Sequence, residues 1–241
     1  VGVNTLSSGG GPSLAERLAA IDERVADAAR RAGRESEHIT RIVVTKFHPA
    51  SLVHDLAALG VRDVAENRQQ ELTAKRAELA DDATLAGVRW HFVGQAQTNK
   101  GRQIRAAADA VHSVDRARLV TALDAAAPGF DPVLDVLLQV NLTDDPGRGG
   151  VVPDELEALA EQVAAASTLR LRGIMAVAPL EEEPRRAFAR VGALSARLRT
   201  VVPDAGWISA GMTADFEDAI AEGATHLRIG SAITGNRPLH G

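Results

Sequence analysis

Three residue types that often carry enzyme chemistry are absent or rare in this chain of 241 residues. It contains no Cys and no Tyr. The absence of Cys excludes disulfides, thiol catalysis and thiolate-bound metal ions together, and the absence of Tyr removes a common general acid and base. Only three of the 27 basic residues are Lys (Lys46, Lys75 and Lys100), and the rest are Arg. Each lysine therefore stands out in a chain that otherwise uses Arg for positive charge.

Charge and hydropathy argue against two kinds of partner. The formal net charge is −5 with both signs interspersed, so the chain lacks the basic footprint of a nucleic-acid-binding protein. No apolar run is long enough to span a membrane, and residues 1–12 form a Gly- and Ser-rich lead that does not resemble a signal peptide. The seven His show no metal-ligand spacing. We expect a soluble cytoplasmic protein with no nucleic-acid partner, no membrane partner and no metal site.

Hydrophobic periodicity alternates between strand-like and helix-like segments eight times. Before the first strand, Ser13 to Glu16 forms a capping box, and apolar residues follow at helical spacing up to Gly33. This pattern predicts an α/β protein, a single (β/α)₈ TIM barrel with an extra N-terminal helix; a doubly wound open sheet is the alternative. We expect residues 1–12 to be a flexible lead and 13–241 to be one barrel domain. The predicted strands are 41–45, 61–65, 88–93, 110–114, 133–141, 169–177, 206–209 and 225–229, and the predicted helices between them are 51–59, 68–80, 98–107, 116–126, 153–166, 183–201 and 214–222.

Lys46 follows the first predicted strand, at the end where such barrels place their active sites. A desolvated Lys can lose its proton and form a Schiff base with a carbonyl, whereas Arg keeps its proton. This position indicates amine chemistry. The alternative is a structural lysine whose stem covers apolar surface at the barrel rim.

The segments after the last two strands are rich in Gly and hydroxyl groups. Ser209 to Thr213 follows strand seven, with Thr213 placed to cap the next helix, and Arg228 to Ser231 ends strand eight. Barrels often bind a phosphate between these two loops; a helix cap and a tight turn would also explain them. Arg228 is a cation between apolar neighbours, so it needs a partner. Either the pyridine nitrogen of a cofactor or a rim carboxylate such as Glu66 would serve.

A Schiff-base lysine, a phosphate cup and an Arg on one barrel face suggest pyridoxal 5′-phosphate. Seven ordered motifs carry a resemblance to the YggS/PROSC family of pyridoxal phosphate homeostasis proteins, whose barrel is shared with the N-terminal domain of alanine racemase. The resemblance spans nearly the whole chain, from about Leu14 to Asn236. The motifs are VTKFHP at 44–49, AENR with QE at 65–71, WHFVG with Q, N and K at 90–100, QVN at 139–141, RGIM at 172–175, SAGMT at 209–213 and RIGS at 228–231.

The resemblance implies a role for each residue of the expected cofactor site. Lys46 would form the internal aldimine, and Arg228 would face the pyridine nitrogen. The phosphate would be surrounded through backbone and hydroxyl groups, and the ring would be lined by polar and apolar side chains. The residues expected around the phosphate are Ser209, Gly211, Met212, Thr213, Gly230 and Ser231. The residues expected beside the ring are Asn67, Asn141 and Met175. The family also implies apo-enzymes that use this cofactor as transient partners, and it favours a monomer or weak dimer.

Three positions depart from the family pattern. His48 stands where a second Lys often follows the Schiff-base Lys, and Arg148 stands in a loop that often carries a Lys. Because Arg cannot accept the aldehyde, transfer of the cofactor through a second lysine is in doubt. Ala210 replaces a usual Met and leaves more room near the phosphate cup.

Three functions compete at this point. The first is a homeostasis protein that holds pyridoxal phosphate and releases it to apo-enzymes, without efficient turnover. The second is an amino-acid racemase that uses the same cofactor, and the third is a Schiff-base aldolase without a cofactor. Two-base racemases of this fold take a Tyr from another domain and subunit, and this chain has no Tyr. An Arg-paired ring is also a weak electron sink, so we favour the first function.

Three further segments invite functional interpretations. His91 alternates with Trp90 and Phe92, which favours a hydrogen-bonded packing residue over a base. The run of Glu at 181–183 before Pro184 is typical of a solvated helix start. The loop at 144–150 is expected to be mobile, and a role as a lid is the alternative.

Overall fold

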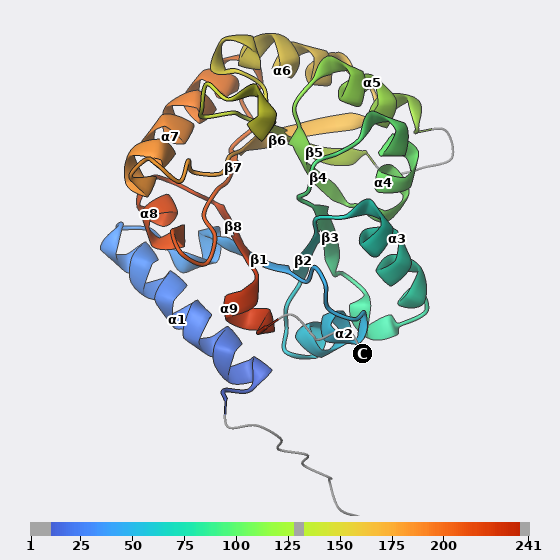
Figure 1. Cartoon of the computed structure of the whole chain (residues 1–241), viewed down its shortest axis with the longest axis vertical. Coiled ribbons are helices and arrows are strands. Elements are labelled where there is room, and N and C mark those ends of the chain that lie inside the picture. Colours follow the sequence, from blue (N-terminus) through green and yellow to red (C-terminus); the bar gives the residue numbers. More distant parts are fainter. Residues whose placement is uncertain (1–10, 128–132, 237–241) are drawn as a thin grey trace, which may run out of the picture.

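Eight parallel strands close into a barrel in the computed structural model, which describes residues 11–127 and 133–236. The strands pair in sequence order, and β1 also pairs with β8, which closes the ring seen in Figure 1. The predicted TIM barrel is confirmed. The strands are β1 (Thr40–Val44), β2 (Asp63–Glu66), β3 (Arg89–Phe92), β4 (Ala110–Val114), β5 (Leu134–Gln139), β6 (Leu169–Met175), β7 (Trp207–Ser209) and β8 (His226–Ile229).

Helices surround the barrel and bury their apolar faces against the outside of the strands. Each predicted helix is present; three predicted ends, at 51, 107 and 201, are the observed ones, and the other ends are shortened by one to three residues. The first residues of the predicted helices at 98–107 and 153–166 form short 3₁₀ turns instead, η3 (Thr98–Lys100) and η5 (Pro153–Glu155). The α-helices are α1 (Leu14–Arg31), α2 (Ser51–Ala58), α3 (Gln69–Glu78), α4 (Gly101–Ala107), α5 (Ala117–Ala125), α6 (Leu156–Ala165), α7 (Pro184–Val201), α8 (Phe216–Ala221) and α9 (Ser231–Thr234).

Strand β2 begins two residues later than predicted, because the backbone of Val61 closes the end of α2 and does not join the sheet. Gly60 has φ 86°, and the N–H of Val61 donates to the carbonyl of Leu56 at 3.0 Å, as at many helix ends that are closed by Gly. Val61 is buried, so the apolar pattern is correct, but its backbone closes the helix. The strand therefore starts at Asp63.

The extra N-terminal helix α1 begins at the predicted capping box, in which Ser13 and Glu16 bond to each other's backbone N–H groups. Its apolar face packs beside the last elements of the chain, α8 and α9. The Arg24 side chain pairs with Glu217 at 2.6 Å, and Arg17 Nε donates to the Ile233 carbonyl at 2.7 Å. This helix therefore fixes the segments that follow β7 and β8. The lead at 1–10 lies outside the described residues, so its flexibility stays a prediction.

The inside of the barrel is more polar than its outside. Because side chains alternate along a strand, Trp90 and Phe92 face the helices while His91 faces inward. Inward positions of other strands carry the polar residues His112 and Arg228, both buried. A small apolar cluster of Ile42, Val44 and Ala65 fills the part of the interior near β1 and β2.

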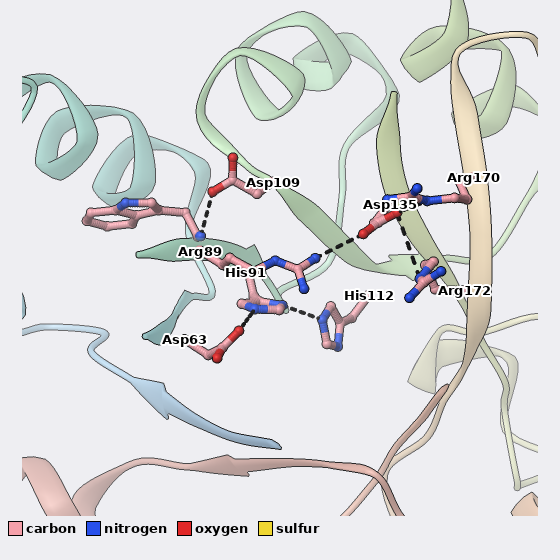
Figure 2. A network of polar contacts seen from close by, with 9 residues as sticks. Asp63, Arg89, His91, Asp109, His112, Asp135, Arg170 and Arg172 are labelled. Carbon is pink, nitrogen blue, oxygen red and sulfur yellow. Dashed lines mark hydrogen bonds and ion pairs between the residues drawn. The ribbon is translucent and has the colours of Figure 1, made fainter. Parts of the chain in front are cut away.

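The N-terminal ends of the strands are closed by ion pairs around Asp135, which is only 4% exposed. Its carboxylate accepts from Arg89 at 2.9 Å and from Arg170 at 2.6 Å, and Arg172 lies 3.9 Å away (Figure 2). These arginines line a cavity of about 760 Å³ on this face. The cavity is at the opposite end of the barrel from Lys46, so it is separate from the site described next.

Candidate functional site

Lys46 lies in a tight turn directly after β1. The N–H of His48 donates to the carbonyl of Thr45 at 3.1 Å, which closes the turn around Lys46 and Phe47. Phe47 has φ 67°, a conformation that is uncommon for a residue with a side chain. Its backbone N–H donates to the Glu71 carboxylate at 2.9 Å, and this bond holds the turn in place. Backbone strain of this kind is concentrated at functional sites.

The Lys46 amine is available for chemistry. The residue is exposed, and within the described residues its Nζ makes no hydrogen bond or ion pair. Its nearest aromatic contact is the Phe47 ring, with the centroid 5.9 Å from Nζ. The predicted position at the C-terminal end of the first strand is confirmed.

Lys75 provides the contrast, because its amine is fully committed. It is 6% exposed, and its Nζ lies 2.5 Å from Glu66 Oε1 and 2.8 Å from the Thr45 carbonyl. Burial raises the pKa of Glu66, although hydrogen bonds from Lys75 and Thr45 act against that rise. Lys75 thereby holds the backbone of Thr45, the residue before Lys46, in place. The sequence did not predict this ion pair between Lys75 and Glu66.

Arg228 is a buried cation with no carboxylate partner among the residues that the structure describes. Its Nη1 donates to the Ser209 carbonyl at 2.7 Å and to Ser209 Oγ at 2.8 Å, and its Nη2 donates to the Ala176 carbonyl at 2.9 Å. Burial lowers the pKa of Arg228 to about 10. The alternative of an ion pair with Glu66 is wrong, because Glu66 is bonded to Lys75 instead.

His91 and His112 continue the hydrogen bonds of Ser209 through the barrel interior. Ser209 Oγ lies 2.9 Å from His112 Nδ1, His112 Nε2 lies 2.9 Å from His91 Nδ1, and His91 Nε2 lies 2.9 Å from Asp63 Oδ1. Figure 2 shows the two imidazole rings and Asp63 in sequence. The interpretation of His91 as a hydrogen-bonded packing residue is confirmed. His112 was missed, although its inward parity in an apolar strand was a usable signal.

The loop after β7 is shaped by Gly211 and capped differently from the prediction. Gly211 has φ 90°, and a Cβ there would lie 2.7 Å from the Ala219 Cβ, so this position requires Gly. The expectation that Thr213 caps the next helix is wrong. The N-cap of α8 is Asp215, two residues later than expected. Its carboxylate accepts from the Met212 N–H at 2.6 Å and so closes the turn before the helix.

The loop after β8 lies next to the Lys46 turn because the barrel closes β8 against β1. Arg228 pairs with Ile42, and Ile229 pairs with Val43. A Cβ on Gly230 would lie 3.7 Å from the Val44 carbonyl, in ordinary van der Waals contact, so Gly230 lies directly beside the end of β1. Ser231 begins α9 and is exposed. The structure thus brings the expected phosphate loops and Lys46 to one face of the barrel; phosphate binding by Gly211, Met212, Thr213, Gly230 and Ser231 stays a prediction.

The three residues expected near the ring differ in their present contacts. Asn67 follows β2, and its buried Oδ1 has no hydrogen-bond partner among the described residues. Met175 ends β6 and is 2% exposed. Asn141 holds its own loop, because its Oδ1 accepts from the Thr143 N–H at 2.9 Å and its Nδ2 donates to the Asp145 carbonyl at 2.8 Å. Only Asn67 offers a clearly unused group.

The segments around residues 144–150 and 181–183 lie beside each other and are joined by a long ion pair. Arg148 Nη1 lies 3.9 Å from the Glu181 carboxylate, whose side chain is 83% exposed. Glu183 is the N-cap of α7 and accepts from two backbone N–H groups, so the predicted solvated helix start is confirmed. Whether the loop acts as a lid is untested and stays a prediction.

The donor set fits a phosphorylated pyridine aldehyde better than a metal ion. The described residues contain no group of three or more His, Asp or Glu side chains that could hold a metal. They contain instead a free lysine amine, a buried guanidinium without a carboxylate, and an unpaired buried acceptor on Asn67. None of the described helices is long and apolar enough to cross a membrane. Fold and site together define a class, the (β/α)₈ barrels with an exposed lysine directly after the first strand.

Comparisons with known proteins place the chain more narrowly. It matches the family described as "Alanine racemase, N-terminal domain" over residues 17–238. It is 41% identical over 229 residues to the pyridoxal phosphate homeostasis protein of Pseudomonas aeruginosa, covering 93% of this chain and 96% of that protein. The protein of the same name in Mycobacterium bovis is 40% identical over 241 residues, with 94% and 93% covered. The chain belongs to this family of pyridoxal phosphate homeostasis proteins.

Solved structures agree with this assignment. PipY of Synechococcus elongatus, in a structure with pyridoxal phosphate bound, superposes with a TM-score of 0.79 at 33% identity, covering 92% of this chain and 100% of that chain. The same protein without the cofactor gives a TM-score of 0.81 at 34% identity, with the same coverage. Alanine racemase from Corynebacterium glutamicum shares the fold, with a TM-score of 0.66 at 17% identity over 93% of this chain and 63% of that chain.

Proposed function

We propose that the chain binds pyridoxal 5′-phosphate covalently through Lys46 and serves in pyridoxal phosphate homeostasis, holding the cofactor and delivering it. The observation that carries this proposal is the unpaired Lys46 amine, beside the loop after β8, in a family whose member PipY has been solved with this cofactor bound. When bound, the cofactor would supply a reactive aldehyde and a pyridine ring. Every other role belongs to side chains of this chain.

Arg228 would contact the pyridine nitrogen. Three of the five N–H donors of its guanidinium are used by Ser209 and Ala176, so two remain for a ligand. Arg donates a hydrogen bond but keeps its proton, so the ring nitrogen would stay unprotonated and the ring would withdraw electrons weakly. Asn67 would lie beside the ring, as the family resemblance implies.

Holding is favoured over catalysis for two reasons. The 41% and 40% identical relatives are named for homeostasis, whereas alanine racemase is similar in fold alone. The chain also lacks Tyr, the residue that we expect for the second base of racemases of this fold. We propose apo-enzymes that use this cofactor as transient partners, the cytoplasm as the site of action, and a monomer or weak dimer as the assembly. Neither nucleic acid nor membranes are proposed as partners.

The deciding experiment is the visible spectrum of the purified protein after incubation with pyridoxal phosphate. We expect the absorbance of a lysine-bound cofactor, its loss in Lys46→Ala, and its retention in Lys100→Ala. Lys100 is the better control because removing Lys75 would leave Glu66 buried without its partner. A wild-type protein that binds no cofactor would refute the proposal.

Incubation of the loaded protein with L-alanine separates holding from racemisation. A homeostasis protein should leave the enantiomeric composition unchanged over many cofactor equivalents. Steady formation of D-alanine at enzymatic rates would instead establish the racemase alternative.

Reactivation of an apo-enzyme tests delivery of the cofactor. An apo-enzyme reactivated equally fast by loaded protein and by free cofactor at the same concentration would argue against direct delivery.

A further inference from the structure

We propose that Ser209, His112, His91 and Asp63 form a directional hydrogen-bond relay through the barrel interior that positions Arg228 for the cofactor ring. The relay deepens the proposed function, on which its role toward the cofactor rests. It assigns positioning roles to His112, His91 and Asp63, and it gives the Ser209 hydroxyl a task other than contact with the phosphate.

The relay crosses five strands without a gap. Starting from Arg228 on β8, it passes to Ser209 on β7, His112 on β4, His91 on β3 and Asp63 on β2, with each link between 2.8 and 2.9 Å long. Ser209, His91 and His112 are all 0% exposed. Each ring nitrogen of both imidazoles therefore has a partner inside the protein and none from solvent.

The two ends of the relay determine where every proton lies. Arg228 can only donate, so Ser209 Oγ must accept the hydrogen bond from its Nη1. Burial alone would raise the pKa of Asp63, but the hydrogen bond from His91 and the nearby Arg89 lower it, so this carboxylate is ionised and can only accept. Between these ends the donors all run one way. Ser209 donates to His112 Nδ1, His112 Nε2–H donates to His91 Nδ1, and His91 Nε2–H donates to Asp63.

The opposite direction is unfavourable for neutral imidazoles. It would turn an unprotonated His91 Nε2 toward the Asp63 carboxylate, so that two acceptors faced each other at 2.9 Å. A cationic His112 would donate from both ring nitrogens and would remove this order, but burial lowers the pKa of His112 well below its ordinary value. With His112 neutral, the favoured order places a proton on Nε2 of both histidines, where His112 faces His91 and His91 faces Asp63.

This order fixes the orientation of the guanidinium. The Ser209 hydroxyl can accept from Nη1 because its own proton is directed to His112. The Ser209 carbonyl accepts from Nη1 and the Ala176 carbonyl accepts from Nη2. Without the relay the hydroxyl could rotate and turn its proton toward Arg228. The two remaining donors of Arg228 would then lose the orientation in which a ring nitrogen can accept from them.

The first test needs no cofactor. Long-range ¹H–¹⁵N NMR on protein labelled at His nitrogens reports which imidazole nitrogen carries the proton. We expect both His112 and His91 to carry a proton on Nε2 at pH 7, with His112 Nδ1 unprotonated, and Ser209→Ala to change the His112 signals. The matched control is Ser113→Ala, because Ser113 Oγ is a buried hydroxyl without a partner among the described residues. A protonated His112 Nδ1 in the wild type would overturn the relay.

The second test uses the loaded protein. Loss of one hydrogen bond to a charged group predicts about tenfold faster cofactor release from Ser209→Ala, together with a shifted absorbance maximum of the bound cofactor. Ser209→Thr, which keeps the hydroxyl, should restore both values, and Ser113→Ala should leave both unchanged. If the wild type bound cofactor and the Ser209→Ala and Ser113→Ala variants behaved alike, the relay would be refuted. If the wild type bound none, only the proposed function would fail, because the tautomers would still be measured.

Discussion

Lys75 and Lys46 have the same side chain but opposite environments. Lys46 extends from a turn into solvent, whereas Lys75 is enclosed and bonded to Glu66 and to the backbone of Thr45. A buried ion pair adds little stability by itself, but removal of one partner leaves a charge without compensation. The role of Lys75 is therefore structural, and it acts next to the site without supplying chemistry.

Lys75→Met should destabilise the protein by about 3 to 5 kcal/mol at neutral pH, because Glu66 would keep a buried carboxylate without a cation. Burial raises the pKa of Glu66 in the folded state, and loss of Lys75 would raise it further. A carboxyl with a raised folded-state pKa contributes stability that is complete below its unfolded pKa and is lost as pH rises through the folded value. Urea unfolding should therefore show the variant to be more stable at pH 5 than at pH 8. The double variant with Glu66→Gln is the control and should lose this pH dependence.

Single residues were predictable where one strand sufficed to place them. Lys46 was located by the apolar run before it and by its rarity, and His91 by its alternation with Trp90 and Phe92. The partner of Arg228 was not predictable in this way, because the choice between Glu66 and Ser209 depends on contacts between strands far apart in the sequence. The proton order of the histidines also needs all five members of the relay at once.

Helix α1 connects the start of the barrel domain to the loops expected to bind phosphate. The guanidinium of Arg17 donates to the carbonyl of Ile233 inside α9. Removal of this side chain in Arg17→Ala should raise the hydrogen-exchange rates of residues 231–235 and cost about 1 to 2 kcal/mol in local stability. Hydrogen-exchange mass spectrometry of the free protein measures this directly. Arg31→Ala, an exposed change on the same helix, should leave the rates unchanged; equal rates in both variants would show that α1 does not order α9.

A long ion pair joins the loop at 144–150 to the segment after β6. Arg148 and Glu181 are separated by 3.9 Å, and Glu181 is largely exposed. If the loop acts as a lid, Arg148→Ala should accelerate cofactor release by up to about fivefold without lowering the unfolding temperature. Glu181→Gln should have the same effect, and the double variant should add nothing more. Release rates identical to the wild type in all three variants would leave an ordinary loop.

Element boundaries were less predictable than the elements themselves. All eight strands and the helices between them follow from periodicity, because each element buries one face. The ends depend on backbone hydrogen bonds that periodicity does not register. Gly60 and Val61 close α2 and delay β2, and Asp215 takes the capping position expected for Thr213. The short helix α9 was not predicted, since four residues are too few to show a helical pattern.

At the scale of the whole molecule, closure of the barrel brings the site together. The Lys46 turn follows β1, and the loops expected to bind phosphate follow β7 and β8, which are the last strands in sequence. The sequence predicts closure through the strand count, and closure makes these ends neighbours. The interior polar residues then join the site to the opposite face of the barrel, where Asp63 lies at the beginning of β2.

Binding of the cofactor should stabilise the entire barrel, because the ligand contacts only the folded state. At a free concentration of about 100 times the dissociation constant, the gain is about 2.7 kcal/mol, which corresponds to a rise of roughly 5 to 10 °C in the unfolding temperature for a chain of this size. Pyridoxine 5′-phosphate has the ring and the phosphate but no aldehyde, so it should give a smaller rise in the wild type. In Lys46→Ala the two ligands should give the same rise, since only non-covalent contacts remain. Differential scanning fluorimetry of both proteins with both ligands measures these rises. A difference between the ligands that persists in Lys46→Ala would mean that another amine binds the aldehyde.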